Sequence, residues 1–229
     1  MIQKLDNGYI VNINKPVEWT SFDVVKKIRN ITRIKRVGHA GTLDPFATGV
    51  LLICMGKATK NVAALMNLKK EYEAILRLGQ TTDTLDLTGN ITEEKPVPEF
   101  DKHQLNEIFR QFTGTIQQKI PAYSAAKIGG RRSYALARKG VEIPDRFKTV
   151  TIYCFKLLDF RASEIHFAVE CGQGTYIRTL AYDIAVKLGT TGHLTRLTRK
   201  RIGDYHLEQS LSLNLFEQHW QAEKHHGNN

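Results

Sequence analysis

The chain has 229 residues, of which 41% are hydrophobic and 24% charged, a composition typical of a globular protein with a substantial core. It holds 33 Lys and Arg against 23 Asp and Glu, and the net charge of +10 indicates a polyanionic partner such as RNA or DNA. No apolar run reaches the roughly 20 residues that a membrane span needs. The three cysteines fit buried thiols in a reducing compartment better than disulfides or a zinc site, so we expect a cytoplasmic protein.

The first elements follow from apolar spacing and capping residues. A strand is predicted over residues 9–14, and it ends before a Lys-Pro pair. Thr20 is expected to cap the helix that follows, with Asp23 as its capping-box partner. An apolar face that begins at Phe22 and repeats to Ile31 predicts that this helix packs on a core and turns its basic residues outward.

The rest of the chain alternates strand and helix patterns. Strands are predicted over 71–79, about 150–159 and 164–171, and helices over 105–112 and 175–188. Residues 81–100 are polar and rich in turn residues, and they are interpreted as a loop. This mixture predicts an α+β fold with helices around one sheet. No glycine-rich phosphate-binding motif follows a strand, so no nucleotide cofactor is expected.

One domain over residues 1–219 is expected, because no linker or internal repeat divides the chain. Within it, residues 117–145 form a basic segment of small residues with a Gly-Gly pair, and we expect this segment to be mobile and to grip RNA. The last ten residues, 220–229, are expected to form a disordered tail.

The most informative motif runs from Gly38 to Gly49 and places one carboxylate, Asp44, among small residues and three glycines. Pro45 disfavours a helical backbone at Asp44, and an apolar block over 50–55 follows as a buried strand or a helix start. A carboxylate on a stiff turn beside the core suits nucleophilic or acid/base chemistry. An ordinary Asp-Pro turn is the alternative, since Asp favours turns through its own side-chain hydrogen bonds.

The positive charge is clustered, which favours phosphate binding over an evenly solvated surface. Three groups are rich in Lys and Arg: residues 26–36, which contain no acid; Lys127, Arg131, Arg132, Arg138 and Lys139; and Arg196, Arg199, Lys200 and Arg201.

Six motifs occur in a fixed order along the chain. They are Asn14-Lys15-Pro16 with Thr20-Ser21, Gly38 to Gly49, Lys70-Glu71-Tyr72, Ser124-Ala125-Ala126-Lys127, Gly174 to Arg178, and Gly192-His193-Leu194 with Leu197. Together they resemble the bacterial tRNA pseudouridine synthase B (TruB) family over about residues 8–210. The resemblance implies the pseudouridine synthase fold, a mixed and mostly antiparallel sheet flanked by helices with a central RNA-binding cleft. It also implies that uridine 55 in the T loop of tRNA is isomerised to pseudouridine without a metal or cofactor.

The resemblance assigns roles to single residues. Asp44 matches the essential carboxylate, Tyr72 the ring that stacks on the flipped uracil, and Arg178 the partner of Asp44. Tyr176 and Leu197 match residues that line the pocket, and His39 one that contacts the T loop. The chain departs from the pattern at Glu18, where the family usually has glycine, and it resembles a short form without the PUA domain that many members carry.

These residue types suit the chemistry independently of the resemblance. An arginine beside a carboxylate orients it through charge-assisted hydrogen bonds, and an aromatic ring holds a base taken out of its stack. Whether Asp44 attacks the sugar, attacks the base or removes a sugar proton is left open.

Several candidates also fit plainer roles. Tyr72, Leu197 and Tyr176 suit core packing, and His39 suits a turn. Lys15, which we include among the substrate-binding candidates, also fits a solvated side chain or a structural contact near the cleft.

Two other functions share this basic surface. One is an RNA-binding module that refolds tRNA without catalysis, and the other is a guide-RNA-dependent synthase of the dyskerin type. The intact motifs around Asp44, Tyr72 and Arg178 favour the enzyme that acts on the T arm of tRNA, and we expect a monomer without a membrane partner.

Overall fold

A computed structural model describes residues 2–124, 126–137, 141 and 143–226. The chain divides into two compact units, which we describe separately. Unit 1 holds Met1–Glu71 and Thr198–Asn229, and unit 2 holds Tyr72–Leu197. The chain passes between the units within two strands, β5 (Lys70–Leu78) and β13 (Gly192–Ile202).

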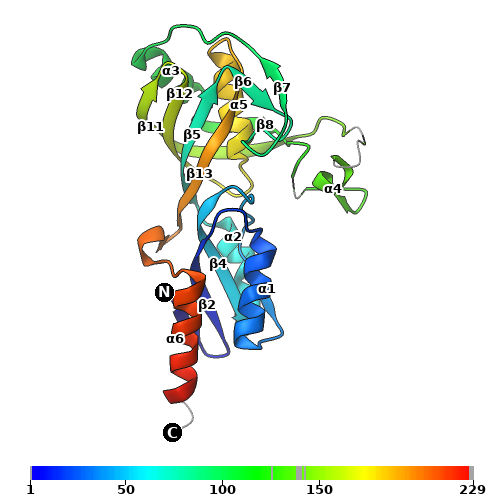
Figure 1. Cartoon of the computed structure of the whole chain (residues 1–229), viewed down its shortest axis with the longest axis vertical. Coiled ribbons are helices and arrows are strands. Elements are labelled where there is room, and N and C mark those ends of the chain that lie inside the picture. The colour runs from blue at the N-terminus through cyan, green and yellow to red at the C-terminus, as the bar shows by residue number, and fades with distance from the viewer. Residues whose placement is uncertain (1, 125, 138–140, 142, 227–229) are drawn as a thin grey trace. The chain divides into compact units, whose positions relative to one another are not determined.

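Unit 1 is built on a small sheet in the order β1-β2-β4, with β3 and the end of β13 also paired to β4 (Figure 1). Most described pairings of the protein are antiparallel, and β4 pairs with β13 in parallel at Thr48 and Gly49. The remaining elements of unit 1 are β1 (Ile2–Leu5), β2 (Gly8–Lys15), α1 (Ser21–Thr32), β3 (Val37–His39), β4 (Thr48–Gly56), a 3₁₀ turn (Lys57–Asn61), α2 (Val62–Asn67), β14 (Tyr205–His206), a second 3₁₀ turn (Leu207–Gln209) and α6 (Leu213–His226).

Both faces of this sheet are covered, which explains the continuous apolar run in β4. Leu51, Ile53 and Met55 face a core shared with α1 and α6. Val50, Leu52 and Cys54 face the opposite core, which includes Leu65 of α2. A strand buried on both faces loses the alternation of a half-exposed strand, so the sequence leaves its type open and the structure decides for a strand.

The cap of α1 is confirmed, but one residue of its expected apolar face is misplaced. Thr20 accepts a hydrogen bond from the Asp23 backbone, and the Asp23 carboxylate accepts one from the Thr20 backbone. Phe22 is 61% exposed, whereas Val24, Val25 and Ile28 are buried. The buried stripe therefore runs through Val24, Val25 and Ile28, and Phe22 lies outside it.

Unit 2 contains a sheet in the order β13-β5-β12-β11-β8, with α3 and α5 beside it (Figure 1). Phe109 of α3 stacks on Phe155 of β11 at 4.1 Å between ring centres, and Phe167 of β12 completes this aromatic cluster. The other elements are β6 (Gln80–Thr82), β7 (Ile91–Glu94), α3 (Lys102–Phe112), β8 (Gly114–Lys119), β9 (Lys127–Ile128), β10 (Arg131–Arg132), α4 (Ser133–Ala137), β11 (Phe147–Arg161), β12 (Glu164–Cys171) and α5 (Ile177–Lys187).

Two stretches of unit 2 differ from the sequence-based interpretation. Residues 81–100 are not a plain loop, because β6 and β7 pair there as an antiparallel ribbon. Residues 117–145 contain β9, β10 and the short helix α4, while Arg138 and Lys139 lie outside the described residues. The expected mobility of that segment stays a prediction.

The end of the chain corrects the expected tail. Residues 220–226 belong to α6, and Trp220 is 6% exposed. Its ring packs edge-on against Tyr9 of β2 at 5.0 Å and beside Phe216 at 5.9 Å between ring centres. The sequence pattern hid this helix because only a narrow stripe of Leu213, Phe216 and Trp220 is buried.

In the part of the chain that the structure describes, none of the helices has the length and hydropathy required to span a bilayer.

Replacing Trp220 by Ala tests the packing of α6. We expect the free energy of unfolding, measured with urea, to fall by about 3–5 kcal/mol because a large buried ring is lost. Leu215→Ala on the same helix is the control: Leu215 is 46% exposed, so a change within about 0.5 kcal/mol is expected. Equal effects of the two substitutions would contradict a docked helix.

Candidate active site

The loop that carries Asp44 joins β3 to β4 in unit 1, and its backbone is fixed by hydrogen bonds. Leu43 N–H donates to the Ser21 hydroxyl at 2.9 Å, at the start of α1. Pro45 C=O accepts from the backbone of Glu18 at 2.8 Å, and Asp44 C=O accepts from Ala47 at 3.1 Å. Leu43 and Ala47 are buried while Asp44 is partly exposed. The backbone of the loop is therefore held on both sides of Asp44.

Lys15 takes a structural position under this loop, one of the roles left open by the sequence. Its side chain is fully buried, and its ammonium donates to Pro45 C=O at 3.1 Å, Trp19 C=O at 2.6 Å and Pro16 C=O at 2.8 Å. Burial lowers the pKa of Lys15 to about 8, and the charge of Asp44 acts in the opposite direction. Three carbonyls thus satisfy the three donors of the ammonium. Direct contact with a substrate stays a prediction for Lys15.

The departure from the family pattern at Glu18 has a structural counterpart. Glu18 adopts φ +66°, the left-handed conformation that glycine accepts without steric cost. Its backbone N–H makes the hydrogen bond to Pro45 C=O. The turn thus keeps a geometry suited to glycine although its side chain is Glu, at a cost of roughly 1–2 kcal/mol.

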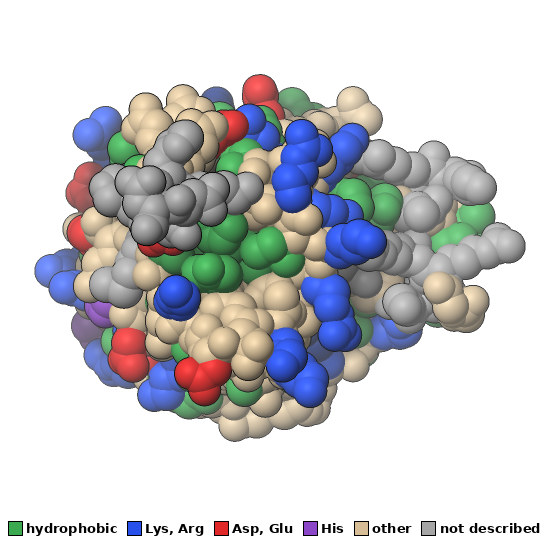
Figure 2. Space-filling model, turned by 90° about the horizontal axis from the view of Figure 1, so that it is seen from below, with side chains coloured by type: hydrophobic (Ala, Val, Ile, Leu, Met, Phe, Trp, Pro, Cys, Tyr) green, Lys and Arg blue, Asp and Glu red, His purple; other side chains and the backbone are tan. Residues whose placement is uncertain are grey.

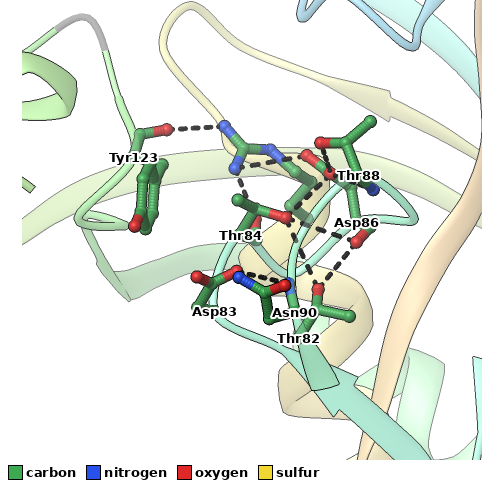
Figure 3. A network of polar contacts seen from close by, with 8 residues as sticks. Thr82, Asp83, Thr84, Asp86, Thr88, Asn90 and Tyr123 are labelled. Atoms are coloured by element: carbon green, nitrogen blue, oxygen red, sulfur yellow. Dashed lines mark hydrogen bonds and ion pairs between the residues drawn. The ribbon is translucent and has the colours of Figure 1, made fainter. Parts of the chain in front are cut away.

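Arg178 lies in the first turn of α5, as expected, and it is 4% exposed. It donates to Thr84 C=O at 2.5 Å and to Tyr123 C=O at 2.8 Å, and its Nη1 lies 3.6 Å from Asp86 Oδ2. Figure 3 shows the guanidinium between Tyr123 on one side and the Thr84–Asp86 turn on the other. Its carboxylate partner within unit 2 is therefore Asp86.

Asp86 was missed by the sequence interpretation, which treated its surroundings as a polar loop. It is 4% exposed, and its Oδ1 accepts from Thr84 Oγ1 at 2.8 Å and from the backbone and hydroxyl of Thr88 at 2.9 and 2.6 Å (Figure 3). These donors hold the carboxylate so that Oδ2 faces the guanidinium. The one feature of the sequence that relates to this network is the density of Thr and Asp over 81–88, residue types that form local side-chain hydrogen bonds in turns.

Tyr176 is held at the N-cap of α5 by Gln118, a fully buried side chain of β8. The Gln118 amide accepts from the Tyr176 backbone N–H at 2.8 Å and donates to its C=O at 3.0 Å. Lys148 Nζ lies 4.3 Å from the centre of the Tyr176 ring and also donates to Gly174 C=O. Burial lowers the pKa of Lys148. Gln118 thus holds the backbone of Tyr176, and Lys148 contacts the face of its ring.

The other expected site residues divide between the units. In unit 1, His39 ends β3 and is half-buried. In unit 2, Tyr72 on β5 is 8% exposed and Leu197 on β13 is 4% exposed, so both also belong to the core. The structure brings Lys15 to the Asp44 loop in unit 1 and Arg178 to Asp86 in unit 2. The pairing of Arg178 with Asp44 stays a prediction.

One member of the third basic cluster is internal, which corrects that part of its interpretation as a phosphate-binding surface. Arg199 is 1% exposed. Arg201 Nε donates to Glu71 Oε2 at 3.1 Å, and Lys200 Nζ lies 3.9 Å from Glu208 Oε1. Arg196 is exposed. Among the described residues, no group of His, Cys, Asp and Glu is arranged to hold a metal ion.

The sequence is similar to one family and to curated proteins that share a name. The model of the family described as "TruB family pseudouridylate synthase (N terminal domain)" matches residues 29–177, which include the Asp44 loop. A tRNA pseudouridine synthase B of Clostridium tetani is 45% identical over 207 residues, 90% of this chain and 71% of that protein. A tRNA pseudouridine synthase B of Phocaeicola vulgatus is 44% identical over 216 residues, 91% of this chain and 92% of that protein.

Solved structures are also similar over nearly the whole chain. A chain from the crystal structure of a Cbf5-Nop10-Gar1 complex matches with a TM-score of 0.74 and 28% identity, over 96% of this chain and 56% of that one. A chain from an H/ACA RNP bound to a substrate RNA with 2′-deoxyuridine matches with a TM-score of 0.71 and 27% identity, over 96% and 55%. The chain thus spans little more than half the length of these chains.

The depressed pKa of Lys15 predicts a pH dependence of stability. Between about pH 8 and the unfolded value of 10.5, the folded protein has lost the Lys15 proton while the unfolded chain still binds it. Stability relative to a Lys15→Met variant should therefore rise across this window, by up to about 3 kcal/mol. Urea unfolding at pH 7 and pH 10 measures the stability difference between wild type and Lys15→Met. Lys57→Met, at an exposed site, is the control, and its stability difference from wild type should not change with pH. A difference between wild type and Lys15→Met that does not change with pH would contradict the assignment.

Breaking the Asp86–Arg178 pair should destabilise unit 2. Asp86→Asn removes the charge opposite a buried guanidinium, and we expect the free energy of unfolding to fall by about 3 kcal/mol. Asp83→Asn, three residues earlier at an exposed site, is expected to cost less than about 1 kcal/mol. Urea unfolding followed by circular dichroism compares the two, and similar losses would show that the charge of Asp86 is not what matters.

Proposed function

The chain belongs to the TruB family of pseudouridylate synthases, and on that premise we propose that it isomerises uridine 55 in the T loop of tRNA. At the coarser level of the family, the activity is the conversion of uridine to pseudouridine in tRNA. The observation that carries the proposal is the loop of Asp44, whose backbone is hydrogen-bonded to α1 and to Lys15 while the residue Asp44 is partly exposed.

The reaction needs one bond broken, the base held and a new bond made. The glycosidic bond from uracil N1 to C1′ of the ribose is cleaved, the base turns, and C5 bonds to C1′ as it gives up its proton, while N1 takes up a proton. In our proposal Asp44 is the essential carboxylate, acting on the sugar, on the base or on a sugar proton. A carboxylate whose backbone is held by hydrogen bonds loses less entropy on reaching the reacting atom.

The remaining side chains are proposed to hold the base. Tyr72 would stack on the flipped uracil, and Tyr176 and Leu197 would line its pocket. Arg178 would orient Asp44, supported by its fixed position on Asp86 and Thr84 C=O. Keeping the freed uracil in place makes its reattachment effectively unimolecular.

The charge of the chain supports an RNA substrate. Figure 2 shows Lys and Arg side chains gathered in a band on one face of the molecule. In the first basic cluster, the side chains of Lys26, Arg33, Lys35 and Arg36 are exposed. Cations in such an arrangement bind phosphates through release of counterions. We propose that the T arm of tRNA is the part bound, with His39 at the T loop; a monomeric state and a cytoplasmic location stay predictions.

Asp44→Asn is expected to remove turnover and keep RNA affinity. Tritium release from C5-labelled uridine in a transcribed tRNA and in a T-arm stem-loop measures the reaction directly, because C5 loses its hydrogen. We expect the rate to fall by about 10²–10⁴-fold or more, since the group that acts on the reacting atoms is gone. The dissociation constant for the same RNA should change less than about threefold.

Asp204→Asn is the matched control, at an exposed turn of unit 1. It should release tritium at the wild-type rate. Substantial activity in Asp44→Asn would remove Asp44 from the mechanism, and a wild-type chain that binds tRNA without releasing tritium would support the refolding module instead.

A further inference from the structure

Arg199 of β13 is buried next to the Asp44 loop, and its guanidinium donates hydrogen bonds to backbone carbonyls of that loop and of β4. It is 1% exposed, and an arginine is rarely so buried unless its donors are satisfied. Its Nε donates to Val50 C=O at 2.7 Å, its Nη2 to Gly41 C=O at 3.2 Å and its Nη1 to Thr42 C=O at 3.4 Å. Arg199 therefore binds the chain on both sides of Asp44.

The backbone of the same residue holds the loop a second time. Arg199 and Gly49 are partners in the parallel pairing of β13 with β4. A Cβ at Gly49 would lie 2.2 Å from Arg199 C=O, so only glycine allows this approach. Thr48 and Thr198 add a hydroxyl contact at 3.1 Å beside it. The end of the loop is therefore joined to β13 through both backbone and side chains.

A guanidinium suits this task better than an ammonium. Its planar fork holds carbonyls on opposite sides at a fixed separation, and it keeps its charge at every physiological pH. Lys15 acts from another direction, on Pro45 C=O at the tip of the loop, and the charge of Arg199 contributes to the lowered pKa of Lys15. Two buried cations therefore lie close together beneath the loop that carries the candidate catalytic carboxylate.

We propose that Arg199 is a positioning residue for Asp44: by fixing Gly41, Thr42 and Val50 to β13, it sets where the carboxylate meets the substrate. The inference rests on the proposed function and deepens it. Arg199 does not touch substrate, since its side chain is enclosed by the loop and the strand. The basic cluster around Arg199 predicts phosphate binding from the sequence, but a side chain that is 1% exposed does not reach a phosphate at the surface.

A positioning role and a merely stabilising role predict different kinetics. If Arg199 only stabilises the fold, substitution lowers the fraction of folded enzyme and leaves the rate constant of the folded molecules unchanged. If it positions Asp44, the folded molecules themselves react slowly. Single-turnover reactions with excess enzyme separate the two roles. An unfolded fraction raises the enzyme concentration needed for saturation, whereas a misplaced Asp44 lowers the rate constant at saturation.

The test compares Arg199→Lys and Arg199→Gln with wild type, using tritium release from a T-arm stem-loop RNA at saturating enzyme. We expect the rate constant to fall at least 30-fold in Arg199→Gln and less in Arg199→Lys, which keeps the charge. The dissociation constant for the RNA should stay within threefold. Hydrogen exchange should quicken in residues 41–50 and stay unchanged in α3. Arg110→Lys, an exposed residue of α3, is the matched control and should react at the wild-type rate.

Four results would overturn the inference. The first is a wild-type rate constant in both folded variants. The second is a weaker RNA affinity at an unchanged saturating rate, which would place Arg199 among the RNA contacts. Failure of both variants to fold would make Arg199 a residue of stability alone. A wild-type chain without activity on the RNA would overturn the proposed function and this inference with it, whereas an active wild type with fully active variants would overturn this inference alone.

Discussion

Buried positive charge bound to backbone carbonyls is the constraint on which the candidate active site depends. Lys15 and Arg199 are both nearly inaccessible to solvent, and between them they donate to Gly41, Thr42, Pro45 and Val50. Removing cations from water is costly, and these two recover part of that cost through charge-assisted hydrogen bonds to backbone carbonyls. The consequence is a loop whose backbone is tied to the core on both sides of Asp44, while Asp44 itself is partly exposed.

Unit 2 uses the same principle with an anion added. Arg178 is buried against two carbonyls and Asp86, and Asp86 is held in turn by the Thr84 and Thr88 hydroxyls and the Thr88 backbone. A buried pair of this kind does little for net stability, but losing one partner is costly because the other charge stays behind. Its value is geometric: these contacts hold the guanidinium in a defined position. A side chain that must orient a reacting group gains from such preorganisation.

Much of the fold was accessible from patterns within short windows of sequence. The capping box of Thr20 and Asp23, the alternation of β12 and the apolar face of α5 all correspond to local structure. The errors have physical reasons. Phe22 follows helical spacing but lies on the exposed side, because the spacing alone does not fix the centre of the buried stripe. Strand β13 was not predicted, since it turns the charged Arg199 inward and so breaks the apolar alternation.

The sequence by itself determined the family, the basic character and the identity of the candidate carboxylate, because motif order and net charge are properties of the linear chain. Only the tertiary structure decided which cations are free to meet RNA and which are enclosed, since Arg199 and the exposed Arg196 look alike in sequence. It also revealed Asp86 as the partner of Arg178, a contact between residues 92 positions apart. Burial and long-range pairing arise when distant segments pack, and no local pattern encodes them.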